Sequence, residues 1–386
     1  MHFPGPLQGL RVIELAAIGP VPLAGMLLAD LGADVQRIDR LEASGLGVAS
    51  LAAEPRHDVN ARGRRSVALD LKLPAGRDAA LRLIARADVL LEGLRPGVTE
   101  KLGLGPDDCH AINPGLIYGR MTGFGQTGPL ARAAGHDLNY IALAGVLHAI
   151  GPAGGKPVPP LNLVGDYGGG ALYLAFGVMA ALFERQHSGR GQVVDAAMVD
   201  GAASLASIFW GLQAAGQWRA PRGENLLDGG TPFYDTYETA DGKYISLAAL
   251  EPKFFVQLAK ALGLEERFVQ RQYDRRLWPE MRAAITGAVR QRTRQAWCEL
   301  LEGSDACFAP VLNFEEAAAH PHSKARAAFI CLDGVQQPAP APRFSRTPAE
   351  HPRPAPSAGQ HSEELLREAG FTDTEMAALR SAGAVR

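Results

Sequence analysis

The sequence predicts an α/β protein with a Rossmann-like parallel sheet and a second, smaller α+β domain. The chain has 386 residues, more than one ordinary hydrophobic core accommodates, so two domains are expected. Strand and helix patterns alternate through its first part, as they do in a parallel sheet with crossover helices. After residue 232 polar and apolar residues alternate around a tight turn, which is typical of an antiparallel hairpin.

The first part of the chain opens with a strand–helix–strand unit. Residues 10–15 form a continuous apolar run, residues 21–31 have a helical pattern, and residues 34–39 are apolar again. A helical crossover of this kind joins parallel strands. The alternation continues with strands expected at 66–71, 88–92, 116–121 and 192–197, and helices expected at 75–87, 137–150, 166–186 and 199–218.

The turn after the first strand argues against a dinucleotide cofactor. Its sequence, AAIGPVP at residues 16–22, lacks the G-x-G-x-x-G pattern. Two prolines occupy positions where a pyrophosphate would need close approach to the backbone. An NAD-dependent oxidoreductase is therefore disfavoured.

The second part of the chain begins after a connector. Residues 219–232 are rich in glycine, proline and charge, which indicates a domain boundary. Residues 233–238 and 243–247 alternate on either side of Asp241-Gly242, a hairpin turn dipeptide. Helical patterns between 252 and 301 complete the smaller unit.

Composition narrows the classes of function. A net charge of −2 argues against a nucleic-acid or membrane-surface binder. The four cysteines are far apart with no C-x-x-C pair, so we expect no metal site and no disulfide framework. The apolar run 171–183 is too short to cross a bilayer. We recognise no signal peptide and no peroxisomal tripeptide, so we expect a cytoplasmic enzyme.

A histidine lies at the start of the helical pattern after residue 136. Gly135 precedes His136, and Asp137 follows it. A single histidine in such a place is most often only a satisfied polar residue. The helix start nevertheless favours a developing oxyanion and a neutral imidazole that can accept a proton.

An aspartate, Asp166, lies at the start of the next helical pattern. It could be an ordinary helix cap. The three glycines that follow, 168–170, weaken a first helical turn, and they would make sense if a ligand approached that backbone closely. We therefore favour a functional role for this segment.

Further candidates follow other strand patterns. Glu251 ends the apolar pattern 245–250 and could orient His136 through the second ring nitrogen, although the sequence alone does not pair them. Basic residues also gather at or beyond strand ends, where parallel sheets bind ligands and where arginine suits phosphate. They are Arg37, Arg40, Arg62, Arg64, Arg65, Lys72 and Arg95.

Several motifs, together and in order, resemble the family III CoA-transferases over nearly the whole chain. They are LRVIEL at 10–15, LADLGADV at 28–35, SVALDLK at 66–72, DVLLEGLRPGV at 88–98, residues 118–128, GQVVD at 191–195 and YDTY at 234–237. The loop ARGRR at 61–65 only approximates the N-R-G-K-R of that family.

The resemblance implies a fold and an assembly. A large Rossmann-like CoA-binding domain would be built from both chain ends, 1–197 and 327–386. A linker helix and connector, 198–232, would lead to the small α+β domain at 233–310, and 311–326 would return. Two chains would interlock as a homodimer, so that no monomer is stable alone.

The resemblance also implies an activity. Within the family, the histidine immediately before Asp137 resembles the pattern of the racemases that act on 2-methylacyl-CoA thioesters. His136 and Asp166 would then be the acid/base pair for 1,1-proton transfer through an enolate, and Glu251 would orient His136. CoA would be part of the substrate, and no cofactor would be needed. Substrate contacts would come from Arg40, Leu69, Asp70, Leu71, Lys72, Arg95, Gly135, Asp137, Leu138, Asn139 and Tyr140.

Other functions stay open at this point. A CoA-transferase would use Asp166 as the nucleophile and would need a second carboxylic acid as acceptor. A CoA-binding protein without turnover would need neither His136 nor Asp166. Neither nucleic acid nor membrane insertion is expected in any of these cases.

Overall fold

The computed structural model describes residues 5–41, 54–349 and 352–386, and the chain divides into two compact units. The first contains Met1–Ala144, Pro160–Ala206 and Ala325–Arg386, and the second contains Gly145–Pro159 and Ser207–Lys324. These boundaries differ from the predicted ones because Gly145–Pro159 joins the second unit and residues 198–206 pack with the first.

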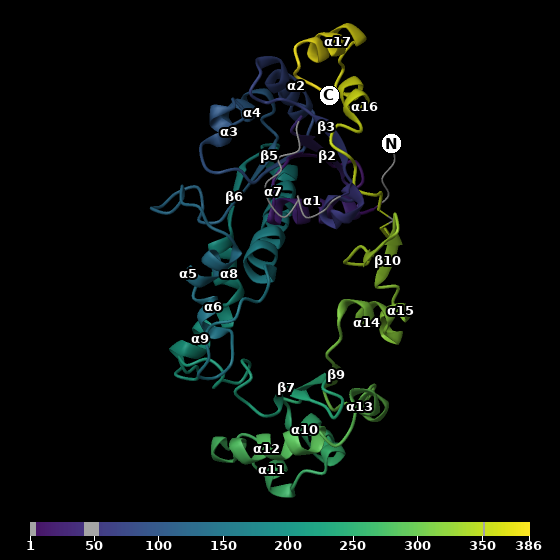
Figure 1. Ribbon diagram of the computed structural model, residues 1–386. Coiled ribbons are helices and arrows are strands. Elements are labelled where there is room, and N and C mark those ends of the chain that lie inside the picture. The colour runs from purple at the N-terminus through teal and green to yellow at the C-terminus, as the bar shows by residue number, and fades with distance from the viewer. Residues whose placement is uncertain (1–4, 42–53, 350–351) are drawn as a thin grey trace. The chain divides into compact units, whose positions relative to one another are not determined.

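The first unit is built on a six-stranded sheet in the order β3-β2-β1-β4-β5-β6 (Figure 1). Every neighbouring pair is parallel. The predicted parallel α/β fold is thus confirmed. The strands are β1 (Arg11–Leu15), β2 (Asp34–Asp39), β3 (Arg65–Ala68), β4 (Val89–Glu92), β5 (Ile117–Thr122) and β6 (Val193–Ala197).

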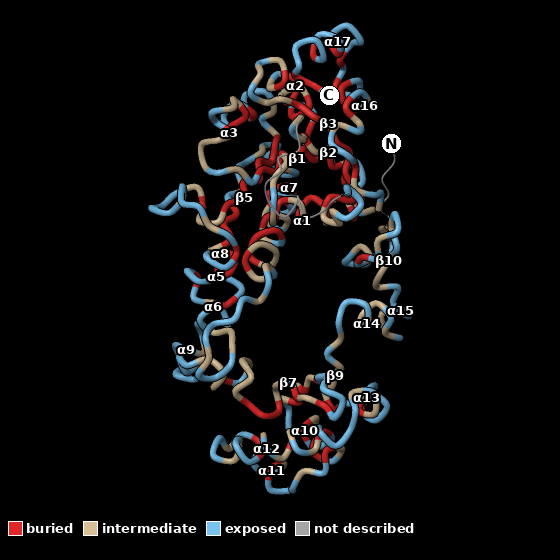
Figure 2. Tube along the Cα trace, in the orientation of Figure 1, coloured by how far each residue is buried: buried red, intermediate tan, exposed pale blue. Residues whose placement is uncertain are grey.

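Helices cover both faces of this sheet, because successive residues of a strand point to opposite sides. In β1, Ile13 packs in one core with α2 (Pro74–Ile84), α4 (Pro106–Ile112), α16 (Ser362–Glu368) and α17 (Asp373–Ser381). Its neighbour Val12 packs in the other core with α1 (Pro20–Asp30) and α7 (Leu172–Ser188). Figure 2 shows the strands between them as buried.

The C-terminal segment belongs to the first unit through specific contacts with β3. Arg65 bridges α16 to β2 by ion pairs with Glu368 and Asp34. The backbone N–H of Ser66 donates to His361 Nδ1 at 3.1 Å, and Val385 bridges to Leu69. In Figure 1 the yellow C-terminal helices accordingly lie beside β3 and α2.

Short elements complete the first unit. They are the 3₁₀ turns Pro55–His57 and Val59–Ala61, α3 (Val98–Lys101), α5 (Asp137–Leu143), the π-helix η4 (Leu163–Ala171), α8 (Met198–Leu205) and the hairpin β10 (Phe329–Leu332) with β11 (Val335–Pro338). The predicted helix 199–218 is therefore two helices, because α8 ends before Ala206 and α9 (Ser207–Ala214) belongs to the second unit.

The π-helix η4 and α7 form one continuous helical run, Leu163–Ser188. Among the described residues it is the one helix long and apolar enough to cross a membrane, so the length argument made from 171–183 does not hold. A core helix passes the same test. Here Leu174 and Val178 are fully buried against the sheet of the first unit, which accounts for the apolar composition of that side.

The second unit contains a three-stranded antiparallel sheet, β7-β8-β9. The hairpin predicted around Asp241-Gly242 joins β7 (Tyr234–Glu238) to β8 (Tyr244–Ala248), and Gly242 has the positive φ of 71° that such a turn requires. The core includes Phe233, Phe255 and Trp297. The remaining elements are α6 (Val146–Ala149), α10 (Pro252–Leu262), α11 (Glu266–Gln270), the 3₁₀ turn Arg275–Leu277, α12 (Trp278–Val289), α13 (Arg294–Leu301), β9 (Phe308–Pro310), α14 (Phe314–Ala319) and α15 (Pro321–Ala325).

We predict that Gly201→Ala lowers the stability of the protein. A Cβ atom on Gly201, in α8, would lie 1.9 Å from the carbonyl oxygen of Gly169 in η4, so the two helices would have to separate. Overpacking of this kind costs about 1–3 kcal/mol or more. Thermal denaturation should show a lower Tm. The control is Gly211→Ala in α9, where a Cβ meets nothing within 4 Å and should not lower it; equal Tm values for the two variants would contradict the packing argument.

Candidate active site

A pocket of about 280 Å³ lies in the first unit at the carboxyl edge of the parallel sheet. This is the edge at which parallel α/β sheets bind ligands, because loops from neighbouring strands diverge there. The loops after β1, β4 and β5 contribute residues, and so do the start of α5 and the π-helix. The lining includes Ile18, Gly19, Pro20, Gly93, Leu94, Arg95, Pro96, Met121, Thr122, Gly123, Phe124, Gly135, His136, Tyr140, Asp166 and Met198.

His136 stands at the entrance of α5, as predicted from the sequence. It is the N-cap residue, with extended backbone, and the Asn139 side chain accepts its backbone N–H at 3.1 Å. The imidazole is exposed and lines the pocket. A helix start leaves backbone N–H groups without intrahelical partners, and such groups favour a neighbouring atom that develops negative charge.

Asp166 lines the same pocket, but its local structure differs from the prediction. It is the fourth residue of a π-helix rather than the cap of an α-helix. Asn162 donates an N–H to its Oδ2 at 3.1 Å. Gly19 of the first βα turn faces the same oxygen, since a Cβ there would be 3.4 Å away.

The pKa of the Asp166 carboxyl is raised above its ordinary value. Burial is the largest cause, because it disfavours the charged form. The hydrogen bond from Asn162 lowers the pKa, the negative charge of Asp137 raises it, and His136 lowers it. A carboxyl group poised in this way exchanges protons nearer to neutral pH than an ordinary aspartate.

The glycines after Asp166 have a different cause from the one expected. A Cβ on Gly169 would lie 2.5 Å from the amide nitrogen of Ala202, and one on Gly170 would lie 3.0 Å from the carbonyl oxygen of Gly165. One on Gly168 would lie 3.0 Å from Leu163 O. Packing of η4 against α8 therefore requires glycine at 169, and the contacts at 168 and 170 leave little room for a larger residue, so close approach of a ligand is not needed to explain the triplet.

Tyr140 supports the pocket wall. Its hydroxyl donates to the carbonyl oxygen of Gly135, and its ring packs edge-on against Phe124 with centroids 4.9 Å apart. A Cβ on Gly123 would lie 2.1 Å from the Tyr140 ring, so glycine is needed at the end of β5. This aromatic contact fixes the segment that precedes His136.

The pocket brings together five of the predicted site residues: Arg95, Gly135, His136, Tyr140 and Asp166. Asp137 is buried and does not line it, whereas Leu138 and Asn139 on the same helix are exposed. Glu251 is the N-cap of α10 in the second unit, so its pairing with His136 stays a prediction.

The residues predicted to surround the adenosine lie outside this pocket. Arg40 follows β2, and 69–72 follow β3, at the same edge of the sheet. Leu69 is 1% exposed as a whole residue and belongs to the core, and its backbone N–H donates to the carbonyl oxygen of Asp39 at 2.9 Å. Asp70 accepts the backbone N–H of Lys72 at 2.9 Å, which shapes the turn into α2.

The sequence interpretation missed part of the pocket. Gly19 and Met198 were not singled out as site residues, and neither was the segment 121–124. Asn162, which donates to Asp166 from outside the pocket lining, was also not singled out. The sequence did contain a signal for these residues, because most of them follow directly after a predicted strand. At residues 16–22 that turn was considered only for the absence of a dinucleotide pattern.

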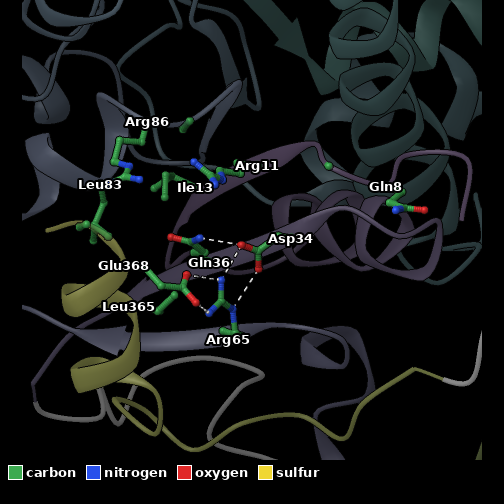
Figure 3. Close-up of a pocket in the computed structure, with 13 residues that line it drawn as sticks. Gln8, Arg11, Ile13, Asp34, Gln36, Arg65, Leu83, Arg86, Leu365 and Glu368 are labelled. Carbon is green, nitrogen blue, oxygen red and sulfur yellow. Dashed lines mark hydrogen bonds and ion pairs between the residues drawn. The ribbon is translucent and has the colours of Figure 1, made fainter. Parts of the chain in front are cut away.

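A second cavity, of about 390 Å³, lies at the opposite, amino edge of the sheet (Figure 3). Arg65 in its wall donates five hydrogen bonds, to Asp34, Glu364 and Glu368. Its donors are therefore fully used in holding α16 on β2 and β3. Because ligands of parallel sheets bind at the carboxyl edge, the pocket with His136 and Asp166 is the better candidate site.

Comparison with known proteins agrees with this fold. The family model described as CoA-transferase family III matches residues 7–362. The chain is 49% identical to alpha-methylacyl-CoA racemase of Mus musculus, over 97% of this chain and 96% of that one. It is 46% identical to the Homo sapiens protein of the same name, with the same coverage. A CAIB/BAIF family crystal structure from Brucella suis superposes with a TM-score of 0.80 at 27% identity, covering 95% of this chain and 100% of that one.

The chain belongs to CoA-transferase family III. The resemblance noted from sequence motifs is thereby confirmed, and so is the likeness of its parallel α/β fold to solved family structures.

We predict that Asn162→Ala raises the pKa of the Asp166 carboxyl further. The variant removes the N–H that stabilises the ionised form, while burial and the charge of Asp137 remain. An NMR pH titration of the aspartate carboxyl carbons, assigned with Asp166→Asn, should show the Asp166 midpoint at higher pH. An unchanged or lower midpoint would contradict the proposed role of this hydrogen bond.

Proposed function

We propose that this protein is an α-methylacyl-CoA racemase, which inverts C2 of 2-methylacyl-CoA thioesters. The observation that carries the proposal is that His136 and Asp166 line one pocket at the carboxyl edge of the sheet. The identity of 46–49% with proteins of that name supports it. The pair supplies two proton-transfer groups, which inversion at one carbon requires.

In the proposed reaction one group removes the C2 proton and the other returns a proton to the opposite face. The C2–H bond breaks, its electrons pass into a thioester enolate, and a new C–H bond forms on the other side. His136 and Asp166 exchange the roles of base and acid with the direction of the reaction. The raised pKa of Asp166 favours this exchange, because a carboxylate with a low pKa would be a weak base.

The enolate oxygen needs stabilisation while the negative charge develops. The start of α5 offers backbone N–H groups without intrahelical partners, beside His136. The thioester itself makes the C2 proton acidic, so the proposal needs no metal, flavin or nicotinamide. Arg95 would meet the phosphates of CoA, with Arg40 and 69–72 nearer the adenosine. Glu251 would orient the His136 ring.

We also propose a homodimer, interlocked as the family resemblance implies. The α7 helix has a buried face and a second apolar face made by Leu172, Phe176, Met179 and Phe183, spaced four, three and four residues apart. Phe176 is 75% exposed and Phe183 66% exposed within the single chain. A contiguous apolar stripe of this kind marks a protein–protein contact.

The alternative is a CoA-transferase that uses Asp166 as nucleophile. The carboxyl group alone fits both activities, because an aspartate can form an acyl anhydride or move a proton. His136 in the same pocket is the feature that favours proton transfer. A transferase would require an acceptor acid, whereas a racemase requires none.

We predict that the protein racemises a single epimer of a 2-methylacyl-CoA in deuterated water and labels C2. Because a base in the pocket removes the C2 proton and solvent returns a deuteron, both epimers should form without added acid. Chiral chromatography with mass spectrometry measures the products. His136→Ala should reduce racemisation by on the order of 10²–10⁴-fold, the usual contribution of one acid/base group.

The transferase alternative predicts different results. It requires turnover only with an acceptor acid, a trapped adduct on Asp166, and little effect of His136→Ala. Wild-type protein that neither labels nor epimerises C2 would exclude the racemase function.

We predict that Phe176→Asp weakens the dimer. A charge in the middle of a buried apolar stripe is costly to desolvate, so the monomer or an unfolded form should increase. Sedimentation velocity measures the assembly. Ile112→Asp, at an exposed apolar position of α4, is the control and should remain dimeric. A wild-type monomer, or a fully dimeric Phe176→Asp variant, would refute this assignment of the α7 face.

A further inference from the structure

Asp137 connects the two proton-transfer groups and does not line the pocket. It is the first residue of α5 and follows His136 directly. Its side chain is 6% exposed overall, which is unusual for a charged residue at a helix start. An aspartate there ordinarily stays in solvent and interacts with the helix dipole.

The contact that buries Asp137 is with the backbone of Asp166. The Asp166 N–H donates to Asp137 Oδ1 at 2.7 Å, across 29 residues of chain. Asp166 lies in the first turn of a π-helix, where i→i+5 bonding leaves the leading N–H groups without partners. The carboxylate therefore satisfies a donor that the π-helix cannot.

Gly165 is shaped by the same contact. A Cβ atom there would lie 2.5 Å from Asp137 Oδ1 and 3.0 Å from its Cγ. Only glycine lets the carboxylate reach the next amide. Gly165 and Asp137 are thus both needed for the same hydrogen bond to the Asp166 amide.

The arrangement has a cost in stability. The second carboxylate oxygen of Asp137, Oδ2, is buried without a hydrogen-bond partner among the described residues. Leaving a buried polar atom unsatisfied disfavours the folded state.

We propose that Asp137 is a positioning residue, which ties the π-helical turn carrying Asp166 to the first turn of α5 carrying His136. The side chain of Asp166 is held separately by Asn162, so backbone and carboxyl each have their own anchor. Movement of one turn relative to the other would change the separation of the two groups. The kinetic consequences rest on the proposed racemase function, but the structural link does not.

Three variants test the proposal. Asp137→Ala removes the anchor. Asp137→Asn keeps an oxygen that can accept the Asp166 N–H and removes the charge. Asp88→Ala is the control for loss of a carboxylate, because Asp88 also accepts a backbone N–H, from Arg11 at 2.9 Å, and pairs with Arg185 at the opposite edge of the same sheet.

Hydrogen–deuterium exchange, followed by mass spectrometry of peptides covering 161–171, tests the link without reference to activity. Exchange in this segment should increase in Asp137→Ala, while Asp137→Asn and Asp88→Ala should match the wild type. Unchanged exchange in a folded Asp137→Ala variant would overturn the proposal. Should Asp137→Ala fail to fold, increased exchange in Asp137→Asn would also overturn it.

Kinetics test the consequence for the reaction. Displacement of a catalytic group by about 1 Å costs on the order of 10²-fold, so kcat of Asp137→Ala should fall by about that factor while KM changes little. Asp137→Asn should keep kcat within about tenfold, and Asp88→Ala should keep it unchanged. A higher KM with unchanged kcat would instead make Asp137 a substrate contact. Equal losses in both Asp137 variants would assign the effect to charge.

A failure of the proposed function remains distinguishable from a failure of this inference. If the wild-type protein has no racemase activity, only the kinetic test is lost. The exchange experiment then decides by itself whether Asp137 holds the Asp166 turn.

Discussion

Close backbone packing around the π-helix η4 is the constraint on which the candidate site depends. Gly169 and Gly201 bring η4 and α8 so near that a single Cβ would collide with backbone. The π-helix in turn places Asp166 at the pocket and leaves its amide free for Asp137. Because the contacts are between backbones, no change of side-chain rotamer can relieve the clash that a larger residue would make.

Buried ion pairs hold together the segments of the first unit around this packing. Arg64 pairs with Glu14 in the interior, and burial raises the pKa of that carboxyl while Arg64 lowers it. Arg62 pairs with Asp30 and also donates to Gln337, which ties the β10–β11 hairpin to α1. Breaking such pairs leaves an uncompensated charge, so they specify one arrangement of distant segments more than they add stability. Arg62, Arg64 and Arg65, which the sequence grouped with possible phosphate contacts, are thus held in ion pairs within the first unit.

The site combines an exposed imidazole with a partly buried carboxyl group in one pocket. His136 is exposed, whereas Asp166 is partly buried. Burial raises the pKa of Asp166, which makes its carboxylate a stronger base than that of an ordinary aspartate. Family membership alone allows transfer or racemisation, since an aspartate can form an acyl anhydride or move a proton. In the proposed reaction His136 supplies the second group for the opposite face of the same carbon, which favours racemisation.

The sequence by itself determined the strand–helix alternation, the hairpin at Asp241-Gly242 and the family. These depend on local periodicity and on motif order, which a single chain displays directly. It also placed His136 at a helix start, because a capping pattern is local.

Only the tertiary structure decided that Asp166 lies in a π-helix, that the three glycines serve helix packing, and that Asp137 anchors the Asp166 amide. It likewise moved Gly145–Pro159 to the second unit and broke the helix expected at 199–218. Each of these depends on atoms brought together from segments far apart in sequence. The periodicity of one segment carries no information about the backbone that will face it.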